Sequence, residues 1–267
     1  MSEKKPALWL KVIAILVYMY IYLPIVILIV FSFNSQKLNV TWESFSLHWY
    51  KVLANDQDVL LATRNTLIIA GVSTVVSTVI GTLAALALQR YRFWGYSFSE
   101  STLYIPVIIP EVVMGISLLV FFSLIGFTLG LGTIILAHIA FNIPFVALVV
   151  RARLHDFDKS IEEASMDLGA NELTTFWRVT LPTIMPGVLS GALLAFTLSL
   201  DDYVVTYFTA GPGSTTLPLR VFSMVRFAVT PEVNALSTIW IMTIFVLLLI
   251  GQLAQRQNTS KQTKVIP

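Results

Sequence analysis

The chain has 267 residues, of which 56% are hydrophobic and 12% are charged, whereas an average soluble domain carries about 25% charged residues. A mean hydropathy of +0.80 indicates an integral membrane protein, and the net charge of +2 gives no sign of nucleic-acid binding. With no cysteine, three histidines far apart and no zinc-type or serine-hydrolase spacing, the sequence excludes disulfides and thiolate sites and predicts no catalytic, metal or cofactor site.

Six apolar stretches are long enough to cross a bilayer as helices, which takes roughly 20 residues each. We therefore predict one all-α transmembrane domain, residues 1–267, with spans at about 10–33, 65–88, 101–125, 132–151, 185–209 and 233–255. The third and fourth spans come from one stretch in which Glu111 is the only formal charge. The glycines of "GFTLGLG" offer the turn between these two spans.

The basic residues indicate the orientation of the six spans. If the N-terminus is inside, most of the 17 lysines and arginines fall on cytoplasmic segments. The positive-inside rule then favours an N-in/C-in topology. The first span is too long for a signal peptide and has no small-residue cleavage site, so we expect an uncleaved anchor.

Two predicted outer loops have distinctive compositions. The first contains four aromatic residues, Trp42, Phe45, Trp49 and Tyr50, which suit an interfacial belt or, as an alternative, a docking surface for a delivering protein. The glycine-rich "GPGSTT" at 211–216 lacks the lysine and the preceding strand of a phosphate-binding loop. It is therefore interpreted as a turn.

The segment between the fourth and fifth spans predicts two short cytoplasmic helices. Ser160 and Glu163 have the spacing of a capping box. Gly169 suits a helix end with positive φ, and Asn171 can cap a second helix that Pro182 closes. Such a pair could lie on lipid headgroups, but interfacial helices usually have a basic polar face. Because the first helix is acidic, docking in a groove of another protein is the favoured alternative.

The same segment resembles the EAA motif of importer-type ABC transporter permeases: Glu-Ala-Ala, three residues, Gly, nine residues, an aliphatic residue, one residue and Leu-Pro. The matching residues are Glu163, Ala164, Ser165, Gly169, Val179, Leu181 and Pro182. Serine replaces the second alanine and valine the usual isoleucine, while every spacing is kept. The resemblance implies that 158–182 are coupling helices that seat on a separate ATPase subunit. ATP and Mg would then be bound by that partner, and this chain would be a transport subunit rather than an enzyme.

Further stretches, "SLDDYVV", "TPEVNALST" and "IPEVVMGISLL", look like the second permease subunit of spermidine/putrescine importers. This implies a type I importer transmembrane domain in the lipid of the bacterial cytoplasmic (inner) membrane. Its implied partners are a second permease subunit, a cytoplasmic ATPase dimer and an extracytoplasmic solute-binding protein. Permeases for iron, thiamine and other solutes are similar and remain alternatives. A proton-coupled secondary carrier is the alternative from another class, although carriers commonly show inverted repeats and none is found.

Two adjacent carboxylates, Asp201 and Asp202, lie inside the fifth predicted span, although an aspartate at a helix centre costs about 2.5 to 3.5 kcal/mol on insertion scales. Counting about 1.5 Å per residue places both, with Glu111, in one layer of the outer half of the bilayer. We expect this layer to bind an ammonium group in transit, with Tyr203 and Tyr207 adding cation–π attraction. The alternative is that hydroxyl groups cap the carboxylates, which then hold the helix bundle together.

Overall fold

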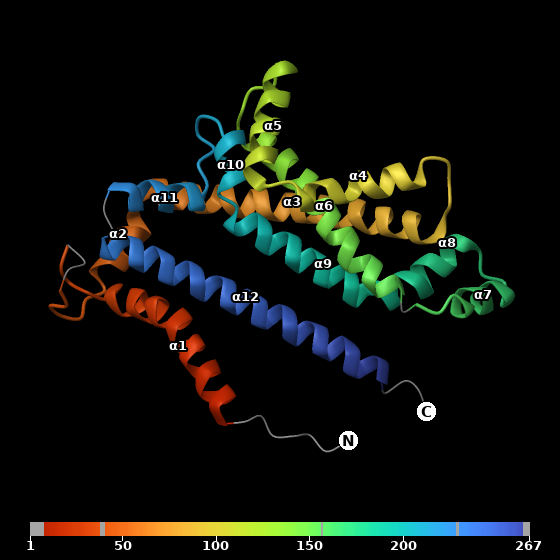
Figure 1. Cartoon of the computed structure of the whole chain (residues 1–267), viewed down its shortest axis with the longest axis horizontal. Coiled ribbons are helices and arrows are strands. Elements are labelled where there is room, and N and C mark those ends of the chain that lie inside the picture. The colour runs from red at the N-terminus through yellow and green to blue at the C-terminus, as the bar shows by residue number, and fades with distance from the viewer. Residues whose placement is uncertain (1–7, 38–40, 156, 228–229, 264–267) are drawn as a thin grey trace. The chain divides into compact units, whose positions relative to one another are not determined.

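The computed structural model describes residues 8–37, 41–155, 157–227 and 230–263, and this part of the chain is all-helical apart from one isolated bridge, Asn34 to Phe45 (Figure 1). In chain order the helices are α1 (Leu8–Phe31), α2 (His48–Asn55), α3 (Gln57–Arg90), α4 (Tyr96–Ile108), α5 (Glu111–Leu124), α6 (Leu131–His155), α7 (Ser160–Asp167), α8 (Glu172–Thr175), the π-helical turn η1 (Phe176–Thr180), α9 (Leu181–Asp201), α10 (Val204–Thr209), α11 (Leu217–Phe227) and α12 (Pro231–Thr263). The bounds of these helices differ from those of the predicted spans at several informative places.

Four helices of the described residues are long and apolar enough to cross a membrane: α1, α3, α6 and the continuous run from α8 through η1 to α9. α4 and α5 make a fifth if they are counted as one span, but they are bent by 112°. Proline disfavours a helical conformation in the residue before it, and Ile109, which precedes Pro110, has the extended values φ −71° and ψ 133°. The predicted span 101–125 is therefore two helices rather than one. Among the described residues of α12, Pro231–Val246 form a further apolar segment.

Two compact units make up the chain, and each is described by itself. The first comprises the described residues up to Leu60 and those within Val221–Ile244. At the loop after α1, the indole N–H of Trp49, on α2, donates to the carbonyl oxygen of Asn34 at 2.9 Å, and Phe45 stacks on Phe33 with ring centroids 5.2 Å apart. Trp49 is buried and belongs to the packing of the loop, whereas Phe45 stays exposed at its surface.

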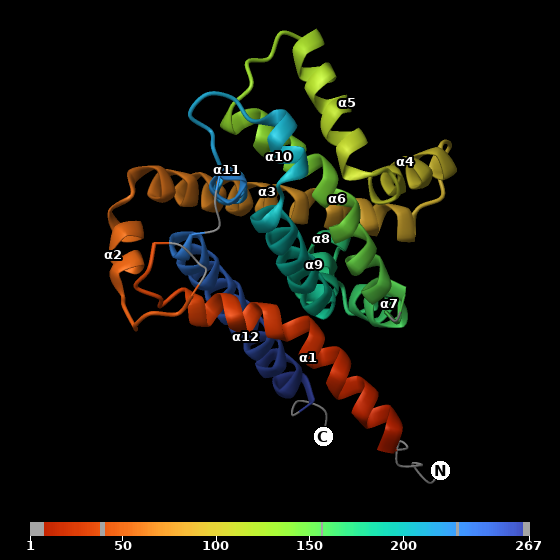
Figure 2. The same cartoon turned by 60° about the vertical axis from the view of Figure 1, so that its left-hand side comes forward.

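The second unit comprises the described residues of Leu61–Arg220 and those after Ile244. Its centre is the close packing of α6 against α9, which lie side by side in Figures 1 and 2. A Cβ added at Gly191 would lie 3.2 Å from Val146 Cγ1, so the backbones approach as membrane helices with small residues do. The buried apolar side chains around this contact are Ala85, Leu86, Val146, Ala147, Val150, Leu154, Ile184 and Ala195.

Within this second unit, different short helices lie at the two ends of α9. α7 and α8 are at the end where α9 begins, and α5 and α10 are at the end where it finishes (Figures 1 and 2). The 21 residues of α9 separate the two ends by about 30 Å at 1.5 Å per residue.

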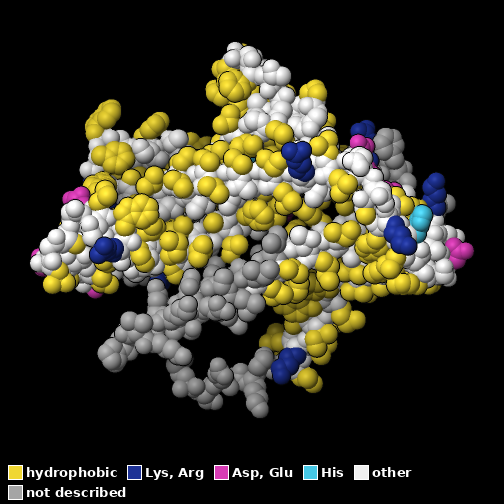
Figure 3. Space-filling view, turned by 180° about the vertical axis from the view of Figure 1, so that it is seen from behind, with side chains coloured by type: hydrophobic (Ala, Val, Ile, Leu, Met, Phe, Trp, Pro, Cys, Tyr) yellow, Lys and Arg dark blue, Asp and Glu magenta, His cyan; other side chains and the backbone are white. Residues whose placement is uncertain are grey.

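Hydrophobic side chains cover wide continuous areas of the surface in Figure 3, as expected for a protein surrounded by lipid.

Candidate functional site

The fifth predicted span is interrupted at its acidic pair. α9 ends at Asp201, and Asp202 has an extended backbone with φ −62° and ψ 120°. The carboxylate of Asp202 accepts hydrogen bonds from the backbone N–H groups of Val205, at 3.3 Å, and Thr206, at 2.7 Å. A side-chain oxygen that accepts from the first turn of a helix is a typical N-terminal cap. Asp202 thus stabilises the first turn of α10, which begins at Val204, and the uninterrupted helix predicted over 185–209 does not form.

A cavity of about 330 Å³ lies at this break. Its lining residues, contributed by α4, α5, α6, α9, α10 and the two breaks, are Pro106, Val107, Ile109, Glu111, Met114, Phe141, Phe145, Leu198, Asp201, Asp202, Tyr203, Val204 and Val205. The structure thereby brings together four of the residues predicted for a substrate path: Glu111, Asp201, Asp202 and Tyr203. The fifth, Tyr207, does not line the cavity and is 58% exposed on α10.

Glu111 and Asp201 are the two exposed carboxylates of the cavity wall. Glu111 is the first residue of α5, directly after the bend at Pro110, and Asp201 is the last residue of α9. The two interruptions of the predicted spans are therefore what bring these carboxylates to one cavity. Charges beside an apolar wall attract a cation more strongly than in bulk water, because the local dielectric constant is lower.

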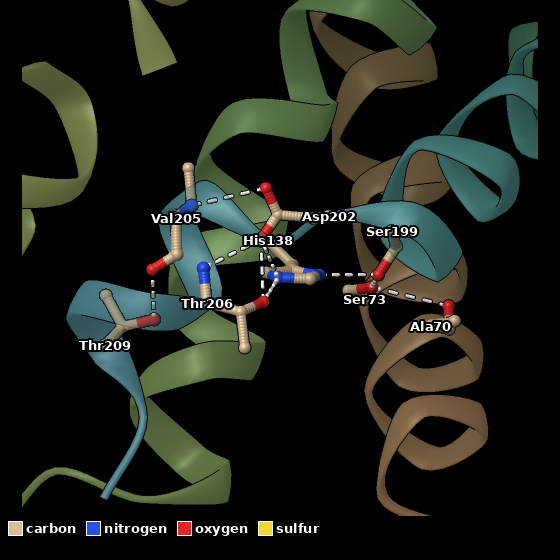
Figure 4. A network of polar contacts seen from close by, with 8 residues as sticks. All are labelled: Ala70, Ser73, His138, Ser199, Asp202, Val205, Thr206 and Thr209. Carbon is tan, nitrogen blue, oxygen red and sulfur yellow. Dashed lines mark hydrogen bonds and ion pairs between the residues drawn. The ribbon is translucent and has the colours of Figure 1, made fainter. Parts of the chain in front are cut away.

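A buried polar network lies behind Asp202 (Figure 4). His138 on α6 has a side chain only 1% exposed. Its Nδ1 lies 2.6 Å from Ser199 Oγ, and its Nε2 lies 3.0 Å from Thr206 Oγ1 and 3.3 Å from Asp202 Oδ2. Ser199 Oγ in turn lies 3.1 Å from Ser73 Oγ. The network therefore connects α3, α6, α9 and α10.

The two adjacent aspartates have different environments. The side chain of Asp202 is 6% exposed, and both of its carboxylate oxygens accept hydrogen bonds, including one of 2.6 Å from the Thr206 hydroxyl. Asp201 is exposed and borders the cavity. Of the two alternatives predicted for the pair, capping by hydroxyl and backbone groups describes Asp202, whereas the part of Asp201 in a substrate path stays a prediction.

The sequence did not predict His138, Ser73, Ser199 or Thr206 as a cluster. These side chains come from four helices, so no local spacing relates them. A usable signal was nevertheless present, because His138 is a titratable residue in the middle of a largely apolar span, and such residues usually find polar partners in a bundle interior.

The two short helices predicted after the fourth span are present as α7 and α8. Gly169 has φ +91°, the left-handed value expected there, and Asn171 Oδ1 accepts from the N–H of Thr174 at 2.8 Å. The expected capping box at Ser160 is wrong. Ser160 is already inside α7, and the carboxylate of Asp158 accepts from its N–H at 2.9 Å. That hydrogen bond lowers the pKa of Asp158 below its usual value.

The second of these helices does not end at Pro182, contrary to the prediction. α8 continues through η1 into α9, which makes Glu172–Asp201 one helical run of 30 residues. The π-helical turn shifts the hydrogen-bond pattern just before Pro182, and this accommodates a residue that has no N–H to donate. The second predicted coupling helix and the fifth span are therefore one continuous element.

Glu162 fastens α7 to the rest of the second unit. Its carboxylate pairs with the guanidinium of Arg90 at the end of α3 and accepts a hydrogen bond from the hydroxyl of Thr180. Glu163, the next residue, is exposed. Two neighbouring acidic side chains thus differ, since one is held within the chain and the other is open to a partner.

Most of the predicted coupling residues lie at the surface of α7 and its surroundings. Glu163, Ala164, Gly169 and Pro182 are exposed, and Ser165 and Leu181 are half-buried. Large apolar side chains accompany them, with Leu168 90%, Leu173 72% and Trp177 61% exposed. This surface combines apolar and acidic groups, which suits contact with a protein better than contact with anionic lipid.

Comparison with known proteins relates this geometry to transport. The family model "Binding-protein-dependent transport system inner membrane component" matches residues 77–261. The spermidine/putrescine transport system permease protein PotC of Escherichia coli (strain K12) is 44% identical over 232 residues, which are 87% of this chain and 88% of the relative. The putrescine transport system permease protein PotI of the same strain is 44% identical over 238 residues, 86% of this chain and 85% of the relative.

Solved structures share the fold at low sequence identity. A bacterial ABC transporter involved in the import of alginate matches with a TM-score of 0.75 and 16% identity, covering 94% of this chain and 95% of that chain. The MetNI methionine ABC transporter matches with a TM-score of 0.65 and 18% identity, covering 80% of this chain and 99% of that chain. The family match and the two close relatives show that this chain belongs to the inner membrane components of binding-protein-dependent transport systems, as a multi-pass ABC importer permease subunit rather than an enzyme.

Proposed function

We propose that this permease forms part of the pathway of an ATP-driven importer for polyamines of the spermidine/putrescine class. The observation that carries the proposal is the cavity at the α9–α10 break, where Glu111 and Asp201 place two carboxylates in a mainly apolar wall. A polyamine combines ammonium groups with methylene chains, so it needs both kinds of surface. The polyamine names of the relatives PotC and PotI support the same substrate class.

The proposed assembly follows the predicted topology of six spans, with both termini in the cytoplasm of a bacterial cell and the spans in its inner membrane. α7 and α8 then lie on the cytoplasmic side, where Glu163 and Gly169 contact a cytoplasmic ATPase dimer that binds ATP and Mg. A second permease subunit completes the pathway, and an extracytoplasmic solute-binding protein delivers the substrate. The exposed apolar and acidic side chains of α7 and α8 support the ATPase contact.

The continuous run from α8 to α9 supports a direct mechanical link. Its 30 residues extend about 45 Å at 1.5 Å per residue, from the proposed ATPase contact to Asp201. When the ATPase dimer closes on ATP, α7 and α8 move with it, and α9 transmits the displacement to the cavity. The pathway then alternates between inward-facing and outward-facing states by rigid-body motion.

The complete transporter, reconstituted in vesicles, tests this function with labelled putrescine and spermidine. Uptake should require ATP and the binding protein, and each polyamine should compete with the other, while thiamine and ferric iron should not. Competition by thiamine or iron alone would assign another solute to the cavity. Uptake by the isolated chain, driven by a pH gradient without the ATPase, would instead identify a proton-coupled carrier and contradict the proposal.

A further inference from the structure

We propose that His138 is a positioning residue for the substrate path. It fixes the break between α9 and α10 so that Asp202 is held inside the protein and Asp201 is left as the free carboxylate of the cavity. His138 does not line the cavity itself, so it acts through the residues that it holds. The inference rests on the proposed polyamine pathway. It adds His138 to that pathway because of the contacts that its ring makes on both sides of the break.

The two ring nitrogens of His138 bind the two sides of the break. Nδ1 is 2.6 Å from Ser199 Oγ in the last turn of α9, and Nε2 is 3.0 Å from Thr206 Oγ1 in α10. The ring is itself fixed, because it packs against Phe141 with centroids 5.1 Å apart and Ser199 is supported by Ser73 from α3. A planar ring that reaches both helices therefore sets the distance between them.

The direction of the hydrogen bonds ties Asp202 to the same ring. The Thr206 hydroxyl donates to Asp202 Oδ2 at 2.6 Å, which leaves its oxygen to accept from the Nε2–H of His138. Nε2 also lies 3.3 Å from Asp202 Oδ2. The backbone N–H and the hydroxyl of Thr206 both donate to this oxygen, and the side chain of Asp202 is only 6% exposed.

This arrangement determines how many carboxylates the cavity offers to a cation. Asp202 borders the cavity but is directed into the network, while Glu111 and Asp201 are exposed. A buried carboxylate without donors is costly inside a membrane protein. If His138 were removed, Asp202 would turn toward the cavity, α10 would lose its fixed start, and Asp201 would no longer keep its place.

Two amide substitutions separate the contacts of His138. In His138→Asn the amide reaches the position of Nδ1 and can bind Ser199, whereas in His138→Gln it reaches that of Nε2 and can donate to Thr206 and Asp202. A histidine that only fills space would tolerate both changes equally. A positioning role through Asp202 predicts that glutamine recovers function better than asparagine.

The first test measures KM and maximal rate of putrescine uptake per assembled transporter. We expect His138→Leu to raise KM about tenfold with a smaller change in maximal rate, because a lost charged hydrogen bond is worth about that factor. His138→Gln should recover most of this loss and His138→Asn little. His48→Asn, at an exposed histidine of α2, serves as the control. Equal KM values for the three variants, or a fall in assembly alone, would overturn the proposal.

The second test does not depend on the transported solute. Because the chain has no cysteine, Asp201→Cys supplies a single thiol whose alkylation rate by a cationic reagent reports the geometry of the break. The rate should change in the His138→Asn background much more than in the His138→Gln background. Equal rates would refute the positioning role, whereas this pattern without any polyamine uptake by the unmodified transporter would refute only the proposed function. In the Asp202→Asn background, the difference between the two His138 variants should disappear.

Discussion

Two pairs of adjacent acidic residues, one on α7 and one where α9 ends, show the same division between a bonded and an exposed side chain. At the cavity, Asp202 is held by Thr206 and His138 while Asp201 is exposed. On α7, Glu162 is held by Arg90 and Thr180 while Glu163 is exposed. One carboxylate of each pair is thus bonded to other residues of the chain, and its neighbour is exposed and available to bind a ligand or a partner protein.

The pairs differ in how the difference between neighbours arises. Within α7, successive side chains point about 100° apart, so the regular helix alone turns Glu162 inward and Glu163 outward. At the cavity the helix stops between the two aspartates, and the separation depends on a cap and on a histidine from another helix. The pair on α7 should therefore resist perturbation elsewhere in the chain, whereas the pair at the cavity should not.

The largest effect in this comparison is expected at Glu162. Glu162→Gln removes a charged partner of Arg90, and hydrogen bonds to charged groups contribute about 1.5 to 3 kcal/mol. Thermal unfolding of the purified transporter should shift down by several degrees. Glu163→Gln is the matched control, since it changes the same group at an exposed site. It should leave the unfolding temperature unchanged and weaken ATPase stimulation instead. Equal shifts for the two variants would contradict the division within the pair.

A smaller effect is expected at Gly169, which shapes the turn between α7 and α8. A Cβ there meets nothing within 4 Å, so a substitution acts only through the φ of +91°. Gly169→Val should cost about 1 to 2 kcal/mol in that conformation and reduce stimulation of ATP hydrolysis by substrate. Asparagine tolerates left-handed backbone, so Gly169→Asn should retain most of the stimulation. Similar losses in both variants would contradict a role of the left-handed turn and would attribute the defect to the changed surface at this position.

The smallest effect is expected at Asp158, which caps α7 from an exposed position. The Ser160 N–H lowers its pKa in the folded state, so its contribution is complete above the unfolded value of about 3.9 and is lost as pH falls through the folded value. Asp158→Asn should therefore lower the unfolding temperature slightly at neutral pH. Scans at decreasing pH should show this difference shrinking. A difference that grows as the pH falls would contradict the assigned cap.

Local rules predicted those parts of the fold that depend on residues close together in the sequence. Apolar runs located the long helices α1, α3, α6 and α9, Gly169 marked a left-handed turn, and Asn171 marked a helix start, because each feature involves only neighbours in the chain. The spacing of Glu111 and the aspartates also placed them at one level, and the structure lines one cavity with them.

The remaining features depend on partners distant in the sequence. The break at Asp202 requires His138, more than sixty positions earlier, and the continuation through Pro182 requires a π-helical turn that no propensity predicts. The ion pair that fixes Glu162 is formed with Arg90, at the end of another span. Such contacts hold one of two neighbouring carboxylates in place, and composition alone does not predict them.

Uptake of labelled putrescine per assembled transporter, measured for Asp201→Asn, is the most direct test of a cationic path through the cavity. Asparagine has nearly the same shape as aspartate, so the change removes charge without opening a void. We expect uptake to fall about tenfold, the equivalent of one lost charged contact, while assembly and the response to nucleotide persist. Glu111→Gln should behave alike, and Glu43→Gln, at an exposed loop residue outside the cavity, should have no effect. Unchanged uptake per transporter in both cavity variants, or a fall that only follows the loss of assembly, would contradict the account.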